Sequence, residues 1–560
     1  KMMRIGVRQW FASGLPWIWL NGAAVAINVI MVVGLLGLIA VRGLGHFWPA
    51  PILQAQIHAQ QEITTLIGSI ADDELVSADQ LRGSGVILPV GQESAKRLLI
   101  KAGNRDITGV DFVWVLEQDL IDPTYPKQVM TLERREWGNF YGELLSVKES
   151  GVVIGDRNDG QDAKLWGLFQ ERLARSISIY DDIKGIETGA IGDINYGMER
   201  LRLDQRRLEL DNQLSPFRQA ELDVKRDLLD RRYEGLQQQL IDLYTAFERD
   251  SIMAQTMSGT QVEINLSKIV RAFRPNGMTA MEKVIFYMAK VWEFVSTDPR
   301  EANTEGGVYP AIFGTVLMVL LMSVMVTPIG VVAAIYLREY AKQGIVTRII
   351  RIAVNNLAGV PSIVYGVFGL GFFIYFLGGN IDQLFFPEAA PAPTFGTPGL
   401  LWASLTLALL TVPVVIVATE EGLSRIPRAV REGSLALGAT KSETLWRVVL
   451  PMSSPAIMTG VILAVARAAG EVAPLMLVGV VKLAPSLPLD GNYPFLHLDQ
   501  KFMHLGFHIY DVGFQSPNVE AARPLVYATA FLLVLVIALL NLSAVAIRNR
   551  LREKYKALES

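Results

Sequence analysis

Residues 448–481 read VVLPMSSPAIMTGVILAVARAAGEVAPLMLVGVV, an apolar run that contains only two charged residues, Arg467 and Glu471. The run is long enough to cross a bilayer. A charge near its middle costs roughly 2.5–3.5 kcal/mol on insertion scales. Because the two residues are four apart, a helix would place them on one face, where they can pair. We expect the pair to line an anion-conducting path; the alternative is a buried pair that only holds two helices together.

The composition indicates a membrane protein with a sizeable soluble part, since 51% of the 560 residues are hydrophobic and the mean hydropathy is +0.31. A formal net charge of −3 argues against bulk nucleic-acid binding. The lack of cysteine excludes disulfides and thiolate metal sites. Lys1, Arg4 and Arg8 precede a long apolar run without a small-residue cleavage site. We interpret this start as a retained anchor rather than a removed signal peptide.

Charge-free stretches of spanning length recur along the chain. They predict an α-helical polytopic membrane protein with six transmembrane helices, which lie within residues 9–41, 310–336, 352–381, 389–419, 448–481 and 524–547.

The short loops predict the orientation, because Lys and Arg concentrate on the cytoplasmic side. The loop at 379–399 has no Lys or Arg, whereas the loops after the second and fourth spans and the tail are basic. Their basic residues are Arg338, Lys342, Arg348 and Arg351; Arg425, Arg428, Arg431, Lys441 and Arg447; and Arg548, Arg550, Arg552, Lys554 and Lys556. We therefore expect a cytoplasmic N-terminus (1–16), a first span (17–41), a periplasmic domain (42–305), a core of five spans (306–548) and a cytoplasmic tail (549–560).

The inserted domain is predicted to be α+β. Residues 109–122, 127–135 and 140–155 are rich in β-branched and aromatic residues with turn signals between them, which indicates a small β-sheet. Residues 196–250 predict a helical hairpin, because Leu222, Leu229, Leu236 and Leu243 recur every seven residues and Ser215-Pro216 interrupts the pattern. The hairpin is either a docking arm or, more commonly, a self-contained pair of helices.

A further amphipathic stretch, residues 279–295, is expected at the outer membrane interface before the second span.

No residues suggest catalysis, so we expect a transport subunit and not an enzyme. Residues 433–438 have the glycine spacing of a phosphate-binding loop, but Ala439 and Thr440 follow where Lys and Ser or Thr are required. His497, His504 and His508 cluster in one outer loop. No carboxylate is obviously arranged with them, so we favour packing over metal binding and expect no metal or cofactor on this chain.

The loop between the fourth and fifth spans predicts a short helix, a turn at Gly438, a second short helix from about Lys441, and a proline that opens the next span. This segment, residues 420–451, resembles the coupling loop of ABC importer permeases, whose pattern is Glu-Ala-Ala, three residues, Gly, nine residues, Ile-x-Leu-Pro. Glu432, Gly438, Leu450 and Pro451 match that pattern. Gly433 and Ser434 replace the alanines, and Val448 replaces the isoleucine.

More of the membrane domain resembles the PstA-type permease of the phosphate ABC importer, in a long form with an extra periplasmic domain. The matching runs are EGGVYPAIFGT at 305–315, LAGVPSIVYG at 357–366 and ARAAGEVAPL at 466–475. The resemblance covers about residues 303–548 and the first span. It implies the ABC type I importer permease fold and a bacterial inner-membrane location.

The resemblance also implies a mechanism. Arg467 and Glu471 would line the phosphate path, while Val417 and Ala418 stand where some members carry a second arginine. The partners would be a PstC-like second permease, a PstB-like ATPase dimer that uses ATP and Mg²⁺, and a PstS-like periplasmic phosphate-binding protein. Two alternatives stay open: a permease for another oxyanion such as sulfate or molybdate, and a membrane-anchored sensor, which would need a cytoplasmic output domain.

Overall fold

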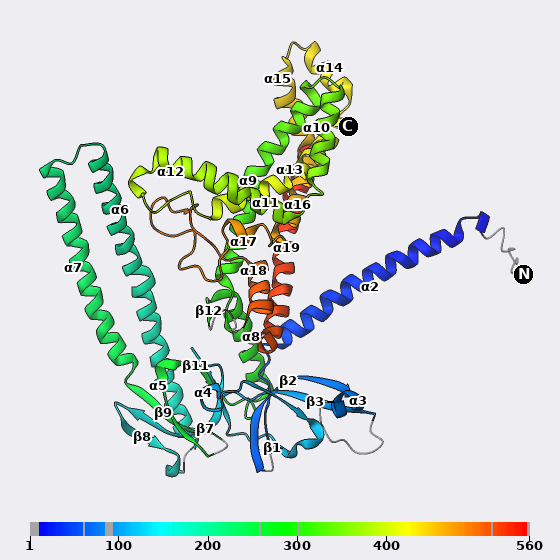
Figure 1. Cartoon of the computed structure of the whole chain (residues 1–560). Helices are drawn as coiled ribbons and strands as arrows, with labels where there is room; N and C mark the ends of the chain where they lie inside the picture. The colour runs from blue at the N-terminus through cyan, green and yellow to red at the C-terminus, as the bar shows by residue number, and fades with distance from the viewer. Residues whose placement is uncertain are drawn as a thin grey trace, which may run out of the picture.

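The computed structural model describes residues 11–556 except 60–61, 84–92, 161, 257–258, 301–302, 304 and 517–518. Lys1, Arg4 and Arg8, and the last four residues of the expected tail, lie outside the described residues. The remainder forms a helical bundle and an inserted domain, residues 46–308, at one end of the bundle (Figure 1).

Six helices in the described ranges are long and apolar enough to cross a membrane, which confirms the predicted number. They are α2 (Leu15–Gly45), α9 (Tyr309–Ile335), the α11–η7–α12 run (Ser362–Phe385), α13 (Leu400–Arg425), the α15–η9–α16 run (Lys441–Ala469) and α19 (Val519–Lys556). Within the two runs the elements are α11 (Ser362–Phe368), η7 (Gly369–Gly378), α12 (Gly379–Phe385), α15 (Lys441–Thr444), η9 (Leu445–Val449) and α16 (Leu450–Ala469).

Two of the predicted stretches begin well before the helices they contain. The third span starts at Ser362 and not at 352, because Pro361 begins a new helix there and residues 345–357 form a separate amphipathic helix, α10 (Ile345–Leu357). The fourth span starts at Leu400 and not at 389, since the proline-rich segment before it forms a 3₁₀ turn and a loop.

The centre of the bundle is α13, which packs against α9 and α16. Small residues permit the contact: a Cβ added at Gly330 of α9 would lie 2.6 Å from Val415 Cγ1. Cβ atoms added at Gly422 and Gly460 would lie 2.5 Å from Ala456 Cβ and 2.7 Å from Ala418 Cβ. Membrane helices that approach this closely associate through van der Waals packing and not through the hydrophobic effect.

The inserted domain contains two antiparallel sheets. One has the strand order β4-β3-β2-β1-β5, and the other has the order β10-β9-β7-β6-β11 with β8 paired to β7. The strands are β1 (Ile52–Ala59), β2 (Glu62–Ser77), β3 (Ser94–Lys101), β4 (Phe112–Leu116), β5 (Ile121–Thr124), β6 (Met130–Arg134), β7 (Phe140–Glu149), β8 (Val152–Asp156), β9 (Asp250–Gln255), β10 (Gln261–Asn265) and β11 (Ile269–Phe273).

The three predicted strand regions are confirmed as strands, but the single sheet expected from them is wrong, because β4 and β5 belong to one sheet and β6 to β8 belong to the other. Helix α5 (Asp162–Lys184) covers the second sheet with Leu165, Phe169 and Leu173 in its core. Short helices α3 (Ala78–Gly83) and α4 (Arg105–Thr108) complete the sheet region.

The helical hairpin is confirmed as α6 (Ile191–Leu210) and α7 (Pro216–Phe247), joined to α5 by the π-helical turn η3 (Gly185–Ala190). Ser215 caps α7 by accepting a hydrogen bond from Arg218 N, and Pro216 occupies the first turn. Arg226 of α7 donates to Gln205 Oε1 of α6 at 2.9 Å.

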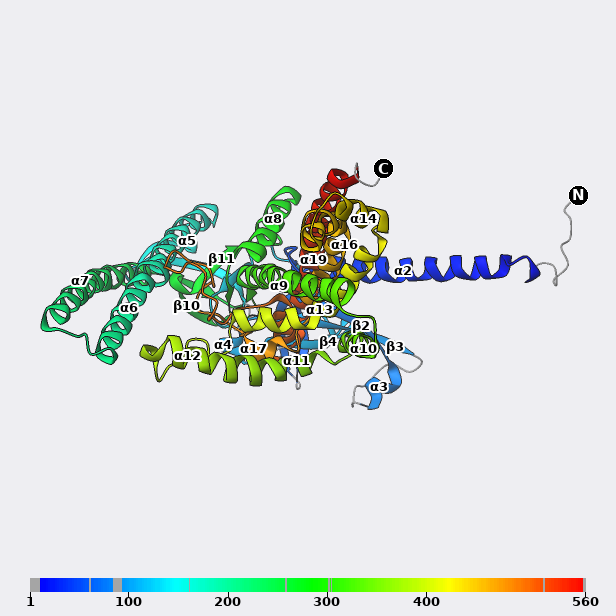
Figure 2. The same ribbon diagram turned by 90° about the horizontal axis from the view of Figure 1, so that it is seen from above.

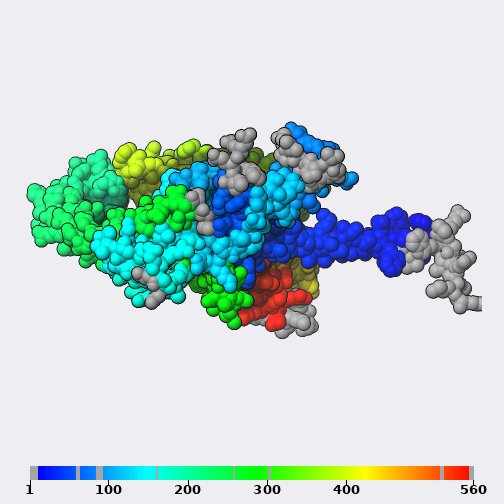
Figure 3. All heavy atoms as spheres, turned by 90° about the horizontal axis from the view of Figure 1, so that it is seen from below, coloured from blue at the N-terminus to red at the C-terminus, as the bar shows by residue number. Residues whose placement is uncertain are grey.

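The hairpin rises beside the bundle (Figure 1) and, seen from below, projects to the side opposite α2 (Figure 3). Its side chains contact loops of the bundle. Arg207 of α6 pairs with Glu388 in η8 (Pro387–Ala389), just before α13. Asn492 Nδ2 donates to Asp193 Oδ1 at 3.2 Å, and Tyr196 donates to the carbonyl of Tyr493. One side of the hairpin therefore contacts loops of the same chain.

The remaining elements connect these parts. They are α8 (Ala280–Ser296), β12 (Pro299–Arg300), β13 (Glu305–Gly306), η6 (Tyr336–Tyr340), α14 (Arg428–Ala436), α17 (Leu475–Val478), α18 (Leu505–Tyr510) and η10 (Asp511–Gln515).

Replacing Gly197 with Leu should loosen the hairpin. A Cβ at Gly197 would lie 3.1 Å from Leu229 Cδ1, and overpacking of this kind costs about 1–3 kcal/mol. Amide hydrogen exchange across residues 191–247 of the full chain should become faster. Gly235→Ala is the control: no atom lies within 4 Å of its added Cβ, so the higher helix propensity of alanine should slow exchange. Equal exchange in both variants would contradict the packing described.

Candidate functional site: a groove beside Arg467 and a helix–turn–helix at the bundle end

Arg467 lies in the last turn of α16, which ends at Ala469. Its Nη2 donates to the carbonyl of Ala358 at 3.3 Å, directly after α10. Its Nε lies 3.9 Å from Glu471 Oε1, and the two side chains are 32% and 22% exposed. The predicted pair is therefore present in the structure.

The predicted placement of both residues on one face of a continuous helix is wrong. Gly470 follows the last helical residue and Pro474 precedes α17, so the apolar run is interrupted between α16 and α17. A turn replaces the helix: Glu471 N donates to the carbonyl of Ala468 at 3.2 Å. This turn keeps the carboxylate beside the guanidinium.

A groove of about 470 Å³ begins beside Ala358, the residue that Arg467 contacts. It runs between the end of α10, one face of α13 and one face of α16. Its lining residues are Asn355, Ala358, Pro413, Val414, Val417, Ala418, Glu421, Thr459 and Leu463. Val417 and Ala418, which replace the second arginine of some PstA-type members, therefore face this groove without a charge.

Charged residues stand near the other end of the groove, at the end of α13. Arg351 Nη2 of α10 lies 3.2 Å from Glu420 Oε1, and Arg425 Nη2 lies 3.7 Å from the groove residue Glu421. Sequence reasoning used Arg351 only as a topology signal and missed this pair, as it missed the carbonyl of Ala358. Pairs between different helices leave no spacing signal in the sequence.

The segment at residues 426–449 forms the predicted helix–turn–helix. Helix α14 ends before Gly438, whose φ of +89° provides the turn. Thr440 and Glu443 form a capping box that starts α15 at Lys441. Pro451 lies in the first turn of α16, as expected, but a helical run that begins at Lys441 leads directly into this helix.

This segment is fixed to the end of α9 and exposes an apolar tip. Arg431 Nη2 lies 3.0 Å from Glu339 Oε1 in η6 and donates to the carbonyl of Leu423 at 2.7 Å. Leu437 is 91% exposed, and Leu435 and Trp446 of the same segment are exposed as well. The arrangement offers a rigid projection with an apolar surface that another protein can cover.

The outer-loop histidines have separate environments. His497 Nε2 lies 2.8 Å from Asp490 Oδ1, and His504 accepts from Gly506 N at the start of α18. Burial lowers the pKa of His504 and of His508 to about 4, so both are neutral at pH 7. In the described ranges, no group of three or more His, Cys, Asp or Glu residues is placed to hold a metal.

Comparison with known proteins identifies the bundle. Residues 326–554 match the family model of the binding-protein-dependent transport system inner membrane component. The phosphate transport system permease protein PstA 1 of Mycobacterium tuberculosis is 36% identical over 247 residues, which cover 43% of this chain and 70% of the relative.

Other relatives match a similar share of the chain. PstA of Mycobacterium leprae is 36% identical over 43% of this chain and 71% of its own length. PstA of Yersinia pestis is 32% identical over 45% of this chain and 75% of its own length. An inward-facing structure of the MetNI methionine ABC transporter is 19% identical, with a TM-score of 0.32, and covers 43% of this chain and 94% of that chain.

The matched bundle holds the groove, the Arg467–Glu471 pair and the helix–turn–helix, whereas the family model leaves residues 1–325 unmatched. The chain belongs to the PstA family of phosphate transport system permeases, with a large domain inserted between its first two membrane helices.

Proposed function

We propose that this chain is a transmembrane subunit of an ATP-driven phosphate importer and forms half of its translocation path. The observation that carries the proposal is the partly exposed guanidinium of Arg467, which contacts the groove residue Ala358. Within the described part of the chain its guanidinium makes one hydrogen bond, to Ala358, and lies 3.9 Å from the nearest oxygen of Glu471. Donor groups therefore remain for an anion.

The chemistry of the pair suits transient binding of phosphate. A guanidinium presents a planar fork of donors that matches two phosphate oxygens. Glu471 supports the charge of Arg467 when the path is empty, and its negative charge lowers the affinity for an anion, which favours release. Since Val417 and Ala418 supply no second cation, the second permease, a PstC-like subunit, would complete the binding site from the facing side of the groove.

Coupling to ATP hydrolysis would occur at the helix–turn–helix. The exposed residues Glu432, Leu437 and Gly438 would contact a PstB-like ATPase dimer that binds ATP and Mg²⁺, while Leu450 and Pro451 set the angle of the helix behind them. Closure of the ATPase dimer would then move α16, and with it Arg467, between two states.

The basic loops favour an orientation in which the helix–turn–helix, the start of α2 and the end of α19 lie on the cytoplasmic side of the bacterial inner membrane. The inserted domain would then face the periplasm, where a PstS-like binding protein delivers phosphate. We propose that the hairpin helps to position that protein and takes no part in conduction.

Arg467→Gln should reduce phosphate uptake at least about tenfold while the complex still assembles. The variant removes charge-assisted hydrogen bonds, worth roughly 1.5–3 kcal/mol each. Arg467→Lys should retain part of the activity, because an ammonium keeps the charge and loses the fork. Uptake into proteoliposomes measures the effect, with sulfate and molybdate as competitors to test the other oxyanions. Arg550→Gln, on an exposed part of α19, is the control. Near-normal uptake by Arg467→Gln would remove this residue from the path.

Gly438→Val should lower ATPase association and substrate-stimulated ATP hydrolysis, because a β-branched residue is strained at a φ of +89°. Gly433→Ala is the matched control, since Gly433 lies in α14 and no atom is within 4 Å of its added Cβ. Hydrolysis and uptake at the unmodified level in Gly438→Val would show that this turn is not the coupling element.

Replacing residues 203–225 with a short Gly/Ser turn should raise the binding-protein concentration needed for half-maximal transport and leave the rate at saturation intact. The change removes the hairpin tip with Arg207 and keeps the Gly197–Leu229 contact. An unchanged concentration dependence would remove the docking role. Loss of all transport in an assembled complex would show that the tip does more than dock.

A further inference from the structure

Helix α8 lies where three parts of the protein meet: the end of α2, the start of α9 and the inserted domain. Phe47, two residues after α2, packs on Phe294 with a ring-centroid distance of 5.0 Å, and Trp48 packs on Tyr287 at 5.9 Å. At the other end, Val308 N donates to the carbonyl of Phe294 at 2.8 Å, directly before α9 begins. The helix is therefore fixed at the points where two membrane spans reach the inserted domain.

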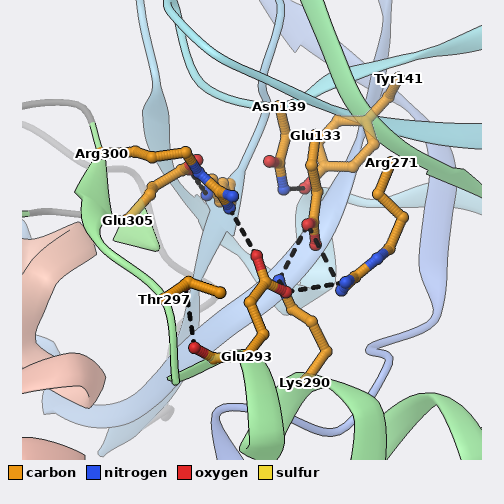
Figure 4. Close-up of polar contacts among 10 residues, drawn as sticks. Glu133, Asn139, Tyr141, Arg271, Lys290, Glu293, Thr297, Arg300 and Glu305 are labelled. Carbon is orange, nitrogen blue, oxygen red and sulfur yellow. Dashed lines mark hydrogen bonds and ion pairs between the residues drawn. The ribbon is translucent and has the colours of Figure 1, made fainter. Parts of the chain in front are cut away.

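One face of α8 binds the inserted domain through a network of charges (Figure 4). Lys290 Nζ donates to Glu133 Oε2 of β6 at 2.8 Å. Glu293 accepts from Arg271 of β11 at 2.8 Å and lies 2.9 Å from Arg300 Nη2 of β12. Burial opposes the charge on Glu133, but Lys290 and Arg271 together hold the pKa of its carboxyl at about 2. The network therefore stays ionised at pH 7 and ties β6 and β11 to the helix.

The opposite face of α8 is apolar and uncovered in the chain alone. Five residues spaced three or four apart are 46–70% exposed there, and they form one stripe: Met281, Val284, Ile285, Met288 and Trp292. Lys290 follows Met288 by two residues, about 200° around the helix. The stripe thus points away from β6 and β11, and a capping box at Thr279 and Glu282 starts the helix in a fixed place.

Relative to the spans α9 and α19, α8 is oriented as a helix lying flat on a membrane surface would be. It is foreshortened in Figure 1, where α9 and α19 run up the page, and is seen along its length in Figure 2, so it crosses the foot of the bundle at a large angle to both spans. A helix with one apolar face, a charged opposite face and a tryptophan in the stripe has the features of an interfacial helix.

We propose that α8 lies in the headgroup region of the leaflet on the inserted domain's side, with its stripe among the acyl chains and its charged face bound to β6 and β11. Lipid is the occupant that the surroundings favour, because α8 packs on the residues that follow α2 and precede α9, two helices apolar enough to cross a bilayer. The helix then holds the inserted domain at a fixed height above the membrane and joins it directly to α9.

The chain contains no cysteine, so single cysteines can report the environment of α8 in the full chain. Val284→Cys and Met288→Cys place a fluorophore on the stripe, and Val224→Cys places it on α7, at a valine that is 69% exposed. In nanodiscs of phosphatidylethanolamine and phosphatidylglycerol, both stripe positions should be quenched at least twofold by lipids with a doxyl group near the headgroup and only weakly by aqueous iodide. Val224→Cys should show the reverse pattern.

Strong iodide quenching of both stripe positions would overturn the proposal, because the stripe would then face water. Protection from both quenchers would overturn it as well, since a protein surface would then cover the stripe. Agreement between two stripe positions guards against a local effect of either substitution, and retention of the α8–β6 contact can be checked in the same samples by hydrogen exchange over residues 130–134.

Discussion

The membrane part of this protein depends on how one guanidinium is accommodated. An arginine exposed to lipid is costly, and non-helical backbone at membrane depth is tolerated only where it is buried in protein or lines a cavity. Both conditions meet at Arg467: α16 ends two residues later, the carbonyl of Ala358 accepts from the side chain, and a groove lies alongside. The helix break, the groove and the charge pair are therefore one arrangement and not three separate features.

Short side chains let the helices around the groove approach closely. Gly330, Gly422 and Gly460 bring α9, α13 and α16 into contact, and Ala418 of α13 faces Gly460 of α16. Val417, Ala418 and Thr459, which line the groove beside this contact, carry no charge. In the proposed half-path, a second subunit would supply the missing wall.

Features that depend on composition and local spacing could be predicted from the sequence. Six spans, the hairpin with its Ser215-Pro216 turn, and the turn at Gly438 follow from hydropathy and helix-end signals. The ends of the helices were predicted less accurately where a proline or glycine divides an apolar run, as at Pro361 and Gly470. Hydropathy alone does not distinguish one long spanning helix from a helix that ends in a turn and is followed by a short second helix, as α16 and α17 are.

Contacts between distant segments could not be predicted. Strands β1 to β3 and β9 to β11 were missed, although residues 53–59 of β1 alternate between apolar and polar types and the burial of β9 alternates as well. The network that joins Glu133 to Lys290 links residues 157 positions apart, and neither residue carries a local signal. The resemblance to PstA-type permeases supplied the membrane fold and gave no information about the inserted domain.

The position of the hairpin has a mechanical consequence. The inserted domain is attached to the chain near α9 through α8, and its hairpin touches the segment before α13 through Arg207 and Glu388. It therefore bridges two helices of the bundle on the side of the inserted domain. If these helices separate during a transport cycle, the hairpin must bend or the Arg207–Glu388 contact must break. The Arg207–Glu388 contact is therefore the point at which the inserted domain and the bundle would part if this end of the bundle opened.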